Sequence, residues 1–218
     1  MKRYTNPKDV FLTHTQALLL PVRVLTNPRD TYSRLRSTVR KAPGTVKAIV
    51  SIYAYIGFSI ISALLILLAG FLYSVYKMAT LDIAGAFGGF AHAVIAAFIY
   101  PLFIAIALGL LDTILIIVPA KLLERDTPDY LGILLIRTSS LIGYAVKPAL
   151  IALLRGPSSL SITEVYKLHL SGSMAWISII VTLVTYALTV YGLVKSGGLR
   201  KSVAAISAGV PVIAHVLV

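Results

Sequence analysis

The sequence has no cysteine, and its 218 residues include only 8 acidic residues, two asparagines and one glutamine. Without cysteine, the chain has no disulfide framework, no thiolate metal site and no thiol nucleophile. The shortage of thermolabile amides indicates a thermophilic source.

Charged side chains are also scarce: they make up 13% of the chain, whereas apolar residues make up 58%. Soluble globular domains carry roughly 25% charged residues, because they must cover their surface with polar groups. The apolar residues form uninterrupted blocks, and several exceed the roughly 20 residues with which a helix crosses about 30 Å of hydrocarbon. The composition therefore excludes an ordinary soluble enzyme and predicts an all-α, polytopic membrane protein.

We predict a transmembrane domain over residues 48–218 with five membrane-spanning helices. The segment 83–97 is rich in glycine and alanine, and Pro101 then removes a backbone hydrogen-bond donor. We interpret 83–97 as a short interfacial or re-entrant helix that precedes the second span. The five spans cover residues 49–76, 99–120, 130–154, 172–194 and 203–218.

Residues 1–47 form a basic arm with 10 of the 20 Lys and Arg residues. Two similar motifs within it, 5–9 and 26–30, contain Asn-Pro followed by a basic residue and Asp. In each, Asn can cap a helix, Pro fits the first helical position, and Asp faces the positive end of the helix dipole. The arm is therefore predicted to hold two short amphipathic helices, the second ending near Lys41. Basic residues of the second helix are expected to contact lipid headgroups, namely Arg29, Arg34, Arg36, Arg40 and Lys41.

The distribution of basic residues indicates the orientation of the spans. Short loops rich in Lys and Arg stay on the cytoplasmic side of a membrane. Five spans place 15 basic residues inside and three outside, whereas a sixth span gives 12 against six. We therefore predict a protein of a prokaryotic cell membrane, with its N-terminus cytoplasmic and its C-terminus outside. Orientation and lipid contacts account for the net charge of +12 without nucleic acid.

Three strong charges fall inside predicted spans: Asp112, Arg137 and Lys147. Asp112 and Arg137 lie about 12 Å and about 10 Å from the inner ends of their spans at helical rise, so they can form an ion pair. This pair is either a gating or proton-linked element of a substrate pathway or a structural contact that fixes two helices in register. Lys147 can extend toward the outer surface along its alkyl stem.

Other chemical signatures are missing from the sequence. His92 and the other histidines have no partner at the spacing of a metal pair. The segment 196–202 contains Gly, Lys and Ser but lacks the first Gly and the spacing of a phosphate-binding loop. No span holds paired carboxylates, and no nucleophile motif occurs. We therefore expect no enzymatic activity, no cofactor and no metal site.

Three local patterns follow one another along the chain. An Asn-Pro motif opens an amphipathic helix at 27–32, and Gly-Tyr-Ala-Val-Lys-Pro-Ala-Leu lies at 143–150 in span three. Tyr-Gly-Leu-Val-Lys at 191–195 ends span four, before a basic, alanine-rich entry to span five at 199–204. Over residues 25–218 the chain resembles the Yip domain family of Rab/Ypt-interacting membrane proteins. The resemblance is to a prokaryotic-type member of that family.

The resemblance carries implications for function. Eukaryotic members are Golgi and endoplasmic reticulum proteins that engage prenylated Rab GTPases in vesicle trafficking and membrane shaping, whereas prokaryotic members have no assigned role. The family is not known for an active site, so the resemblance implies no catalytic residue.

Two functions of different classes follow from the sequence. The first is a non-enzymatic scaffold or partner-binding subunit of Yip type, with membrane lipids and other membrane proteins as partners in a homo- or hetero-oligomer. The alternative is a small transporter or channel subunit with a polar path at Asp112, Arg137 and Lys147. A continuous polar cavity that reaches Asp112 would favour the alternative, and a sealed interface would favour the scaffold.

Overall fold

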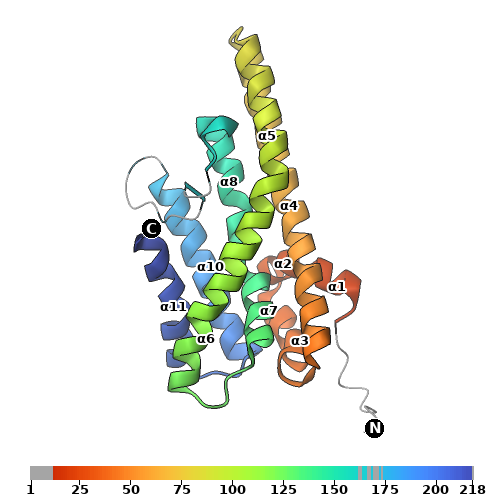
Figure 1. Cartoon of the computed structure of the whole chain (residues 1–218), viewed down its shortest axis with the longest axis vertical. Coiled ribbons are helices and arrows are strands. Elements are labelled where there is room, and N and C mark those ends of the chain that lie inside the picture. The colour runs from red at the N-terminus through yellow and green to blue at the C-terminus, as the bar shows by residue number, and fades with distance from the viewer. Residues whose placement is uncertain (1–11, 162–163, 166–167, 169–171, 173, 218) are drawn as a thin grey trace.

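The computed structural model describes residues 12–161, 164–165, 168, 172 and 174–217 (Figure 1), and these form helices joined by turns, with no strand among them. This confirms the all-α prediction. The helices are α1 (His14–Leu18), α2 (Leu20–Thr26), α3 (Pro28–Lys41), α4 (Gly44–Ala79), α5 (Ile83–Ile104), the π-helix η1 (Ala105–Leu111), α6 (Asp112–Leu123), α7 (Tyr130–Ser140), α8 (Ile142–Arg155), the 3-10 turn η2 (Pro157–Ser159), α10 (Ala175–Lys195) and α11 (Lys201–Leu217).

Among the described residues, three helices are long and apolar enough to cross a membrane: α4, the continuous helix formed by α5, η1 and α6, and α10. The pair α7 and α8, which bends by 41° at its junction, makes a fourth if it counts as one span. Helix α11 is apolar but has 17 residues, fewer than the roughly 20 needed to cross the hydrocarbon. The helices are those of a membrane protein, but the division into five spans is not confirmed.

The segment 83–97 is not a separate interfacial or re-entrant helix. Helix α5 continues without a break through Pro101 into η1 and α6. Its small residues Ala86, Gly89 and Ala93 are buried, and the Ser74 hydroxyl of α4 donates to the Ala86 carbonyl at 2.9 Å. Small side chains thus let α5 pack closely along α4 as a continuous helix, without a re-entrant turn.

Helices α4 and α5–η1–α6 form an antiparallel hairpin that extends beyond the other helices (Figure 1). At its turn, Leu81 has a positive φ of 62°, and Lys77 Nζ lies 3.0 Å from the Asp82 carboxylate. The ammonium group of Lys77 holds the pKa of the Asp82 carboxyl below its ordinary value. Apolar side chains around this turn are exposed: Leu81 is 87% and Phe87 is 66% accessible.

The arm packs into the bundle rather than standing apart from it. Asn27 caps α3, because its side-chain oxygen accepts the N–H of Asp30 at 3.3 Å, as the motif predicts; the matching motif at 5–9 lies outside the described residues. The apolar face of α3, formed by Tyr32, Leu35 and Val39, is buried with side chains of α7 and α10. This face therefore contacts protein, and only the basic side of α3 points outward.

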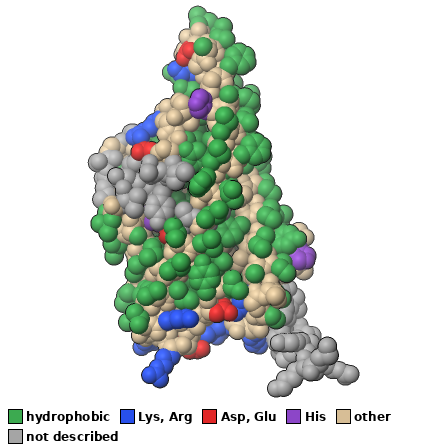
Figure 2. Space-filling view, viewed as in Figure 1, with side chains coloured by type: hydrophobic (Ala, Val, Ile, Leu, Met, Phe, Trp, Pro, Cys, Tyr) green, Lys and Arg blue, Asp and Glu red, His purple; other side chains and the backbone are tan. Residues whose placement is uncertain are grey.

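Basic side chains gather at one end of the bundle (Figure 2), which is formed by α3, the connection after α6 and the connection between α10 and α11. Arg40 Nη2 lies 2.9 Å from the Asp126 carboxylate. Lys47 Nζ lies 2.9 Å from the carboxylate of Asp129. These ion pairs join the arm to the connection between α6 and α7, so the basic end is a single surface.

The packing of α1 on α4 predicts the effect of a methyl group at Gly57. A Cβ at this position would overlap the Leu18 carbonyl of α1, whereas a Cβ at Gly88 of α5 meets no heavy atom within 4 Å. Overpacking costs about 1–3 kcal/mol, so Gly57→Ala should lower the thermal midpoint in detergent. Gly88→Ala should leave it unchanged or raise it, because Ala favours a helix by up to about 1 kcal/mol over Gly. Equal midpoints for the two variants would contradict this packing.

Candidate functional site: a buried charge network

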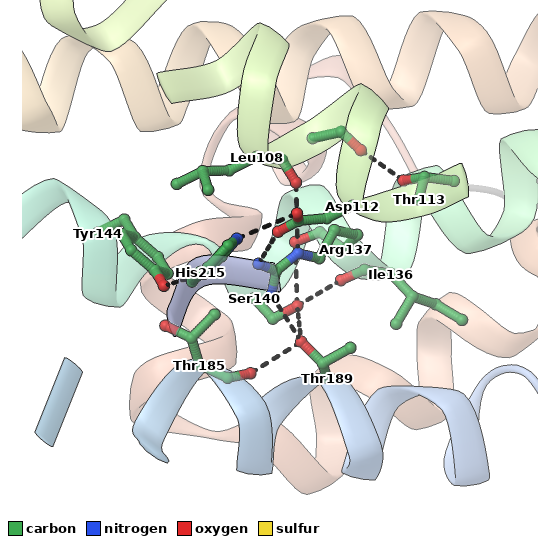
Figure 3. A network of polar contacts seen from close by, with 11 residues as sticks. Leu108, Asp112, Thr113, Ile136, Arg137, Ser140, Tyr144, Thr185, Thr189 and His215 are labelled. Atoms are coloured by element: carbon green, nitrogen blue, oxygen red, sulfur yellow. Dashed lines mark hydrogen bonds and ion pairs between the residues drawn. The ribbon is translucent and has the colours of Figure 1, made fainter. Parts of the chain in front are cut away.

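Asp112 and Arg137 form an ion pair between α6 and α7 (Figure 3). The Asp112 side chain is fully buried, and the Arg137 side chain is 5% accessible. A single charge at the centre of a bilayer costs about 2.5–3.5 kcal/mol on insertion scales. Each of these two groups lowers that cost for the other, so the helices that carry them are held at this depth.

His215 of α11 is the second partner of the Asp112 carboxylate. Its Nε2 lies 3.2 Å from Asp112 Oδ1, and its Nδ1 lies 3.0 Å from the hydroxyl of Tyr144 on α8. The two rings meet edge to face at a centroid distance of 6.0 Å. His215 thus connects three helices through one imidazole. Sequence reasoning missed it, because a lone histidine in an apolar segment carries no local sign of a partner 103 residues away.

The remaining donors of Arg137 reach α10 and the π-helix. Its Nη1 donates to the Thr189 hydroxyl at 3.1 Å, and its Nε donates to the Leu108 carbonyl at 3.4 Å. The Thr189 hydroxyl in turn lies 3.0 Å from that of Ser140 on α7 and 2.8 Å from the Thr185 carbonyl. The guanidinium group is therefore bonded on three sides by groups from three different elements.

Side chains also support the π-helix η1 next to this pair. Three successive carbonyls within it accept hydrogen bonds: Leu108 from Arg137, Gly109 from the hydroxyl of Thr113 at 2.5 Å, and Leu110 from the hydroxyl of Tyr130 at 3.2 Å. Such i→i+5 segments occur mainly as short bulges in longer helices, often at functional positions. Here the wider turn sets a carbonyl where Arg137 can reach it.

The other intramembrane charge predicted from sequence lies elsewhere. Lys147 is on α8 and is 1% accessible; it takes no part in the contacts of Asp112 drawn in Figure 3. Among the described contacts, neither Asp112 nor Arg137 bonds to Lys147. The structure also leaves Lys147 buried, so the side chain does not extend to the surface as expected.

The residues expected to contact lipid headgroups lie on or near the basic end. Arg29, Arg36 and Lys41 are exposed, while Arg34 pairs with Asp30 at 3.0 Å along the same face of α3. Arg40 is half-buried by its contact with the connection after α6. Four of the five cations are thus accessible, and the fifth fixes the arm to the bundle. Headgroup contact stays a prediction.

The network consists of polar contacts that join neighbouring helices. Its carboxylate is sealed by two nitrogen-bearing side chains. Within the described part of the chain, no group of three or more His, Asp or Glu side chains could hold a metal ion. Two surface grooves on the α4–α5 hairpin are lined almost wholly by apolar side chains, and neither is lined by a charged residue. What the arrangement can do is hold α6, α7 and α11 at one depth.

Removal of one charge from the pair should be costly. Asp112→Asn or Arg137→Gln should each lower the free energy of unfolding by about 3–5 kcal/mol, because a lone buried charge is left behind. The double variant should lose less than the sum by about 0.5–3 kcal/mol, measured by SDS-induced unfolding in mixed micelles.

The control for this cycle is Asp30→Asn, which breaks the exposed pair with Arg34 and should cost less than about 1 kcal/mol. Strictly additive effects of Asp112→Asn and Arg137→Gln would contradict a direct interaction between the two side chains.

Comparison with known proteins adds no relative to this description. No protein-family model matches the chain, and no curated protein or solved structure is similar to it.

Proposed function

We propose that the chain is a non-enzymatic membrane scaffold of Yip type that binds other membrane proteins. The observation that carries the proposal is the sealed network: Asp112 is fully buried and is bonded to both Arg137 and His215. Charges used in transport face a water-filled cavity or the substrate pathway. Charges that are buried inside a bundle and bonded to one another and to neighbouring helices hold those helices together, as a scaffold requires.

The α4–α5 hairpin is the part of this scaffold that meets partners. It is longer than the other helices, and many of its described apolar side chains are exposed along both of its helices (Figure 2). A membrane protein can associate with others through such a face by van der Waals packing and close backbone approach. Phe87 lies in α5 close to the turn of the hairpin and is 66% accessible.

The basic end is the cytoplasmic side in this proposal. It joins the arm to the connection between α6 and α7 by two ion pairs, and to the connection between α10 and α11 by the Ser196 hydroxyl, which donates to the Tyr32 carbonyl of α3. Anionic lipid attracts basic segments by about 1 kcal/mol per residue near the surface. The exposed cations Arg29, Arg36 and Lys41 would therefore orient the scaffold, while the hairpin remains free to bind.

Site-specific photocrosslinking in native membranes tests the scaffold. A photoreactive residue at Phe87 should give a discrete crosslinked protein, either a second copy or a different membrane protein. The same residue at Ile206, an exposed position of α11, should give at least about fivefold less of it. The absence of a discrete product at Phe87, or an equal yield at both positions, would contradict partner binding through the hairpin.

Proton flux in liposomes that contain the purified protein tests the competing transporter. The scaffold predicts the same slow flux for the native chain and for Asp112→Asn. A flux that is fast in the native chain and lost in this variant would favour a transporter instead.

A further inference from the structure

A groove of about 360 Å³ runs along the outer surface of the hairpin, between α4 and the helix that comprises α5 and η1. Two rows of three branched side chains form its walls, and each row follows the i, i+4, i+8 spacing of one helix face. The walls are Ile52, Ile56 and Ile60 from α4 and Leu102, Ile106 and Leu110 from α5 and η1.

The floor of the groove is set by the contact between α4 and the π-helix. Tyr55 and Ser59 line the groove between the two rows. The hydroxyl of Tyr55 lies against Gly109, where a Cβ would overlap it, and this buried oxygen has no hydrogen-bond partner within the described structure. The absence of a side chain at Gly109 therefore leaves the space that the Tyr55 hydroxyl occupies.

The chemistry of the lining selects an apolar occupant. No charged residue lines the groove, and the Tyr55 oxygen is turned toward Gly109 rather than toward an occupant. A polar ligand would lose its hydration and find only the Ser59 hydroxyl beside it, which costs several kcal/mol on apolar transfer scales. A hydrocarbon chain has no such cost and gains dispersion contacts with six branched side chains.

The position of the groove indicates where the hydrocarbon occupant would come from. Its wall residues are about 40–60% exposed on a face that is apolar along its length, and a hydrocarbon layer is what such a face meets in a membrane. At helical rise the groove is about 12 Å long and starts about 8 Å from Lys47 at the basic end. One leaflet of the hydrocarbon core is about 15 Å thick. With Lys47 in the headgroup layer, which adds about 5–7 Å outside the hydrocarbon, the groove lies within the leaflet next to the basic end and runs parallel to the lipid chains.

We propose that this groove is a binding site for one acyl chain of a phospholipid from the leaflet next to the basic end. The inference rests on the membrane location in the proposed function but does not depend on partner binding. A bound chain packs between the two rows and covers the seam where α4 meets the π-helix. The site differs from the general lipid surface because two helices and a recessed floor surround the chain on three sides.

Photolabelling with a lipid probe tests the site in the full-length protein. The protein is placed in phosphatidylcholine liposomes that contain phosphatidylcholine with a diazirine in the middle of one acyl chain, and adducts are mapped by mass spectrometry. Labelling of 52–60 and 102–110 should exceed that of the equally exposed stretch 64–75 by at least about threefold. Even labelling of all these segments would overturn the proposal, because it would show only the annular lipid that any span collects.

Two matched variants separate the groove from the surface around it. Ile56→Trp fills the groove, whereas Leu64→Trp places the same ring on the same helix outside it, at a position that is 61% exposed. The first should reduce groove labelling by at least about threefold, and the second should leave it unchanged. Unchanged labelling in Ile56→Trp would overturn the site.

The thermal midpoint shows whether a variant folds, and crosslinking at Phe87 tests the scaffold proposal separately from the lipid site. If Ile56→Trp does not keep the native thermal midpoint, Ile60→Trp, at the end of the same row, is used in its place. Loss of crosslinking at Phe87 with retained groove labelling would contradict the scaffold and support the lipid site. The reverse result would contradict the lipid site alone.

Discussion

Asp112 and Arg137 lie in an apolar bundle where each lowers the cost of burying the other's charge, and this constraint fixes the positions of the helices around them. The pair sets α6 against α7 at one depth, and the fully buried carboxylate then accepts from His215 of α11. Breaking a buried pair leaves an uncompensated charge, which costs more than the pair itself contributes to stability. The network therefore works mainly by excluding other registers, because any slip of α6 along α7 would separate the charges.

The same constraint accounts for irregular elements nearby. The π-helix between α5 and α6 provides the Leu108 carbonyl that accepts from Arg137, and its neighbour Gly109 leaves room for Tyr55. The lipid-facing groove lies on the other side of this contact. The buried hydrogen bond from Arg137 and the groove on the surface thus adjoin the same element, the π-helix from Ala105 to Leu111. A regular helix there would place different carbonyls toward Arg137.

Sequence indicated the ion pair but not the rest of the network. The depths of Asp112 and Arg137 could be counted from charged helix ends, because rise per residue is constant. His215 could not be found this way, since its partners are remote in sequence. The packing of the apolar face of α3 on protein could not be predicted either, because an amphipathic pattern shows that a face is apolar but not what covers it. The small residues in 83–97 permit close helix packing, but the segment continues into the following helix and does not form a separate one.

The sealed state of Asp112 can be measured directly by chemical modification of carboxylates. With the protein in liposomes permeabilised on both faces, a water-soluble carbodiimide and an amine should modify Asp126 and Asp129, whose side chains are 85% and 55% accessible. Asp112 should remain unmodified until the protein is unfolded in SDS. Modification of Asp112 in the folded protein at a rate similar to that of Asp129 would show that water reaches the network, and this result would contradict its role as a closed fastening of the helices.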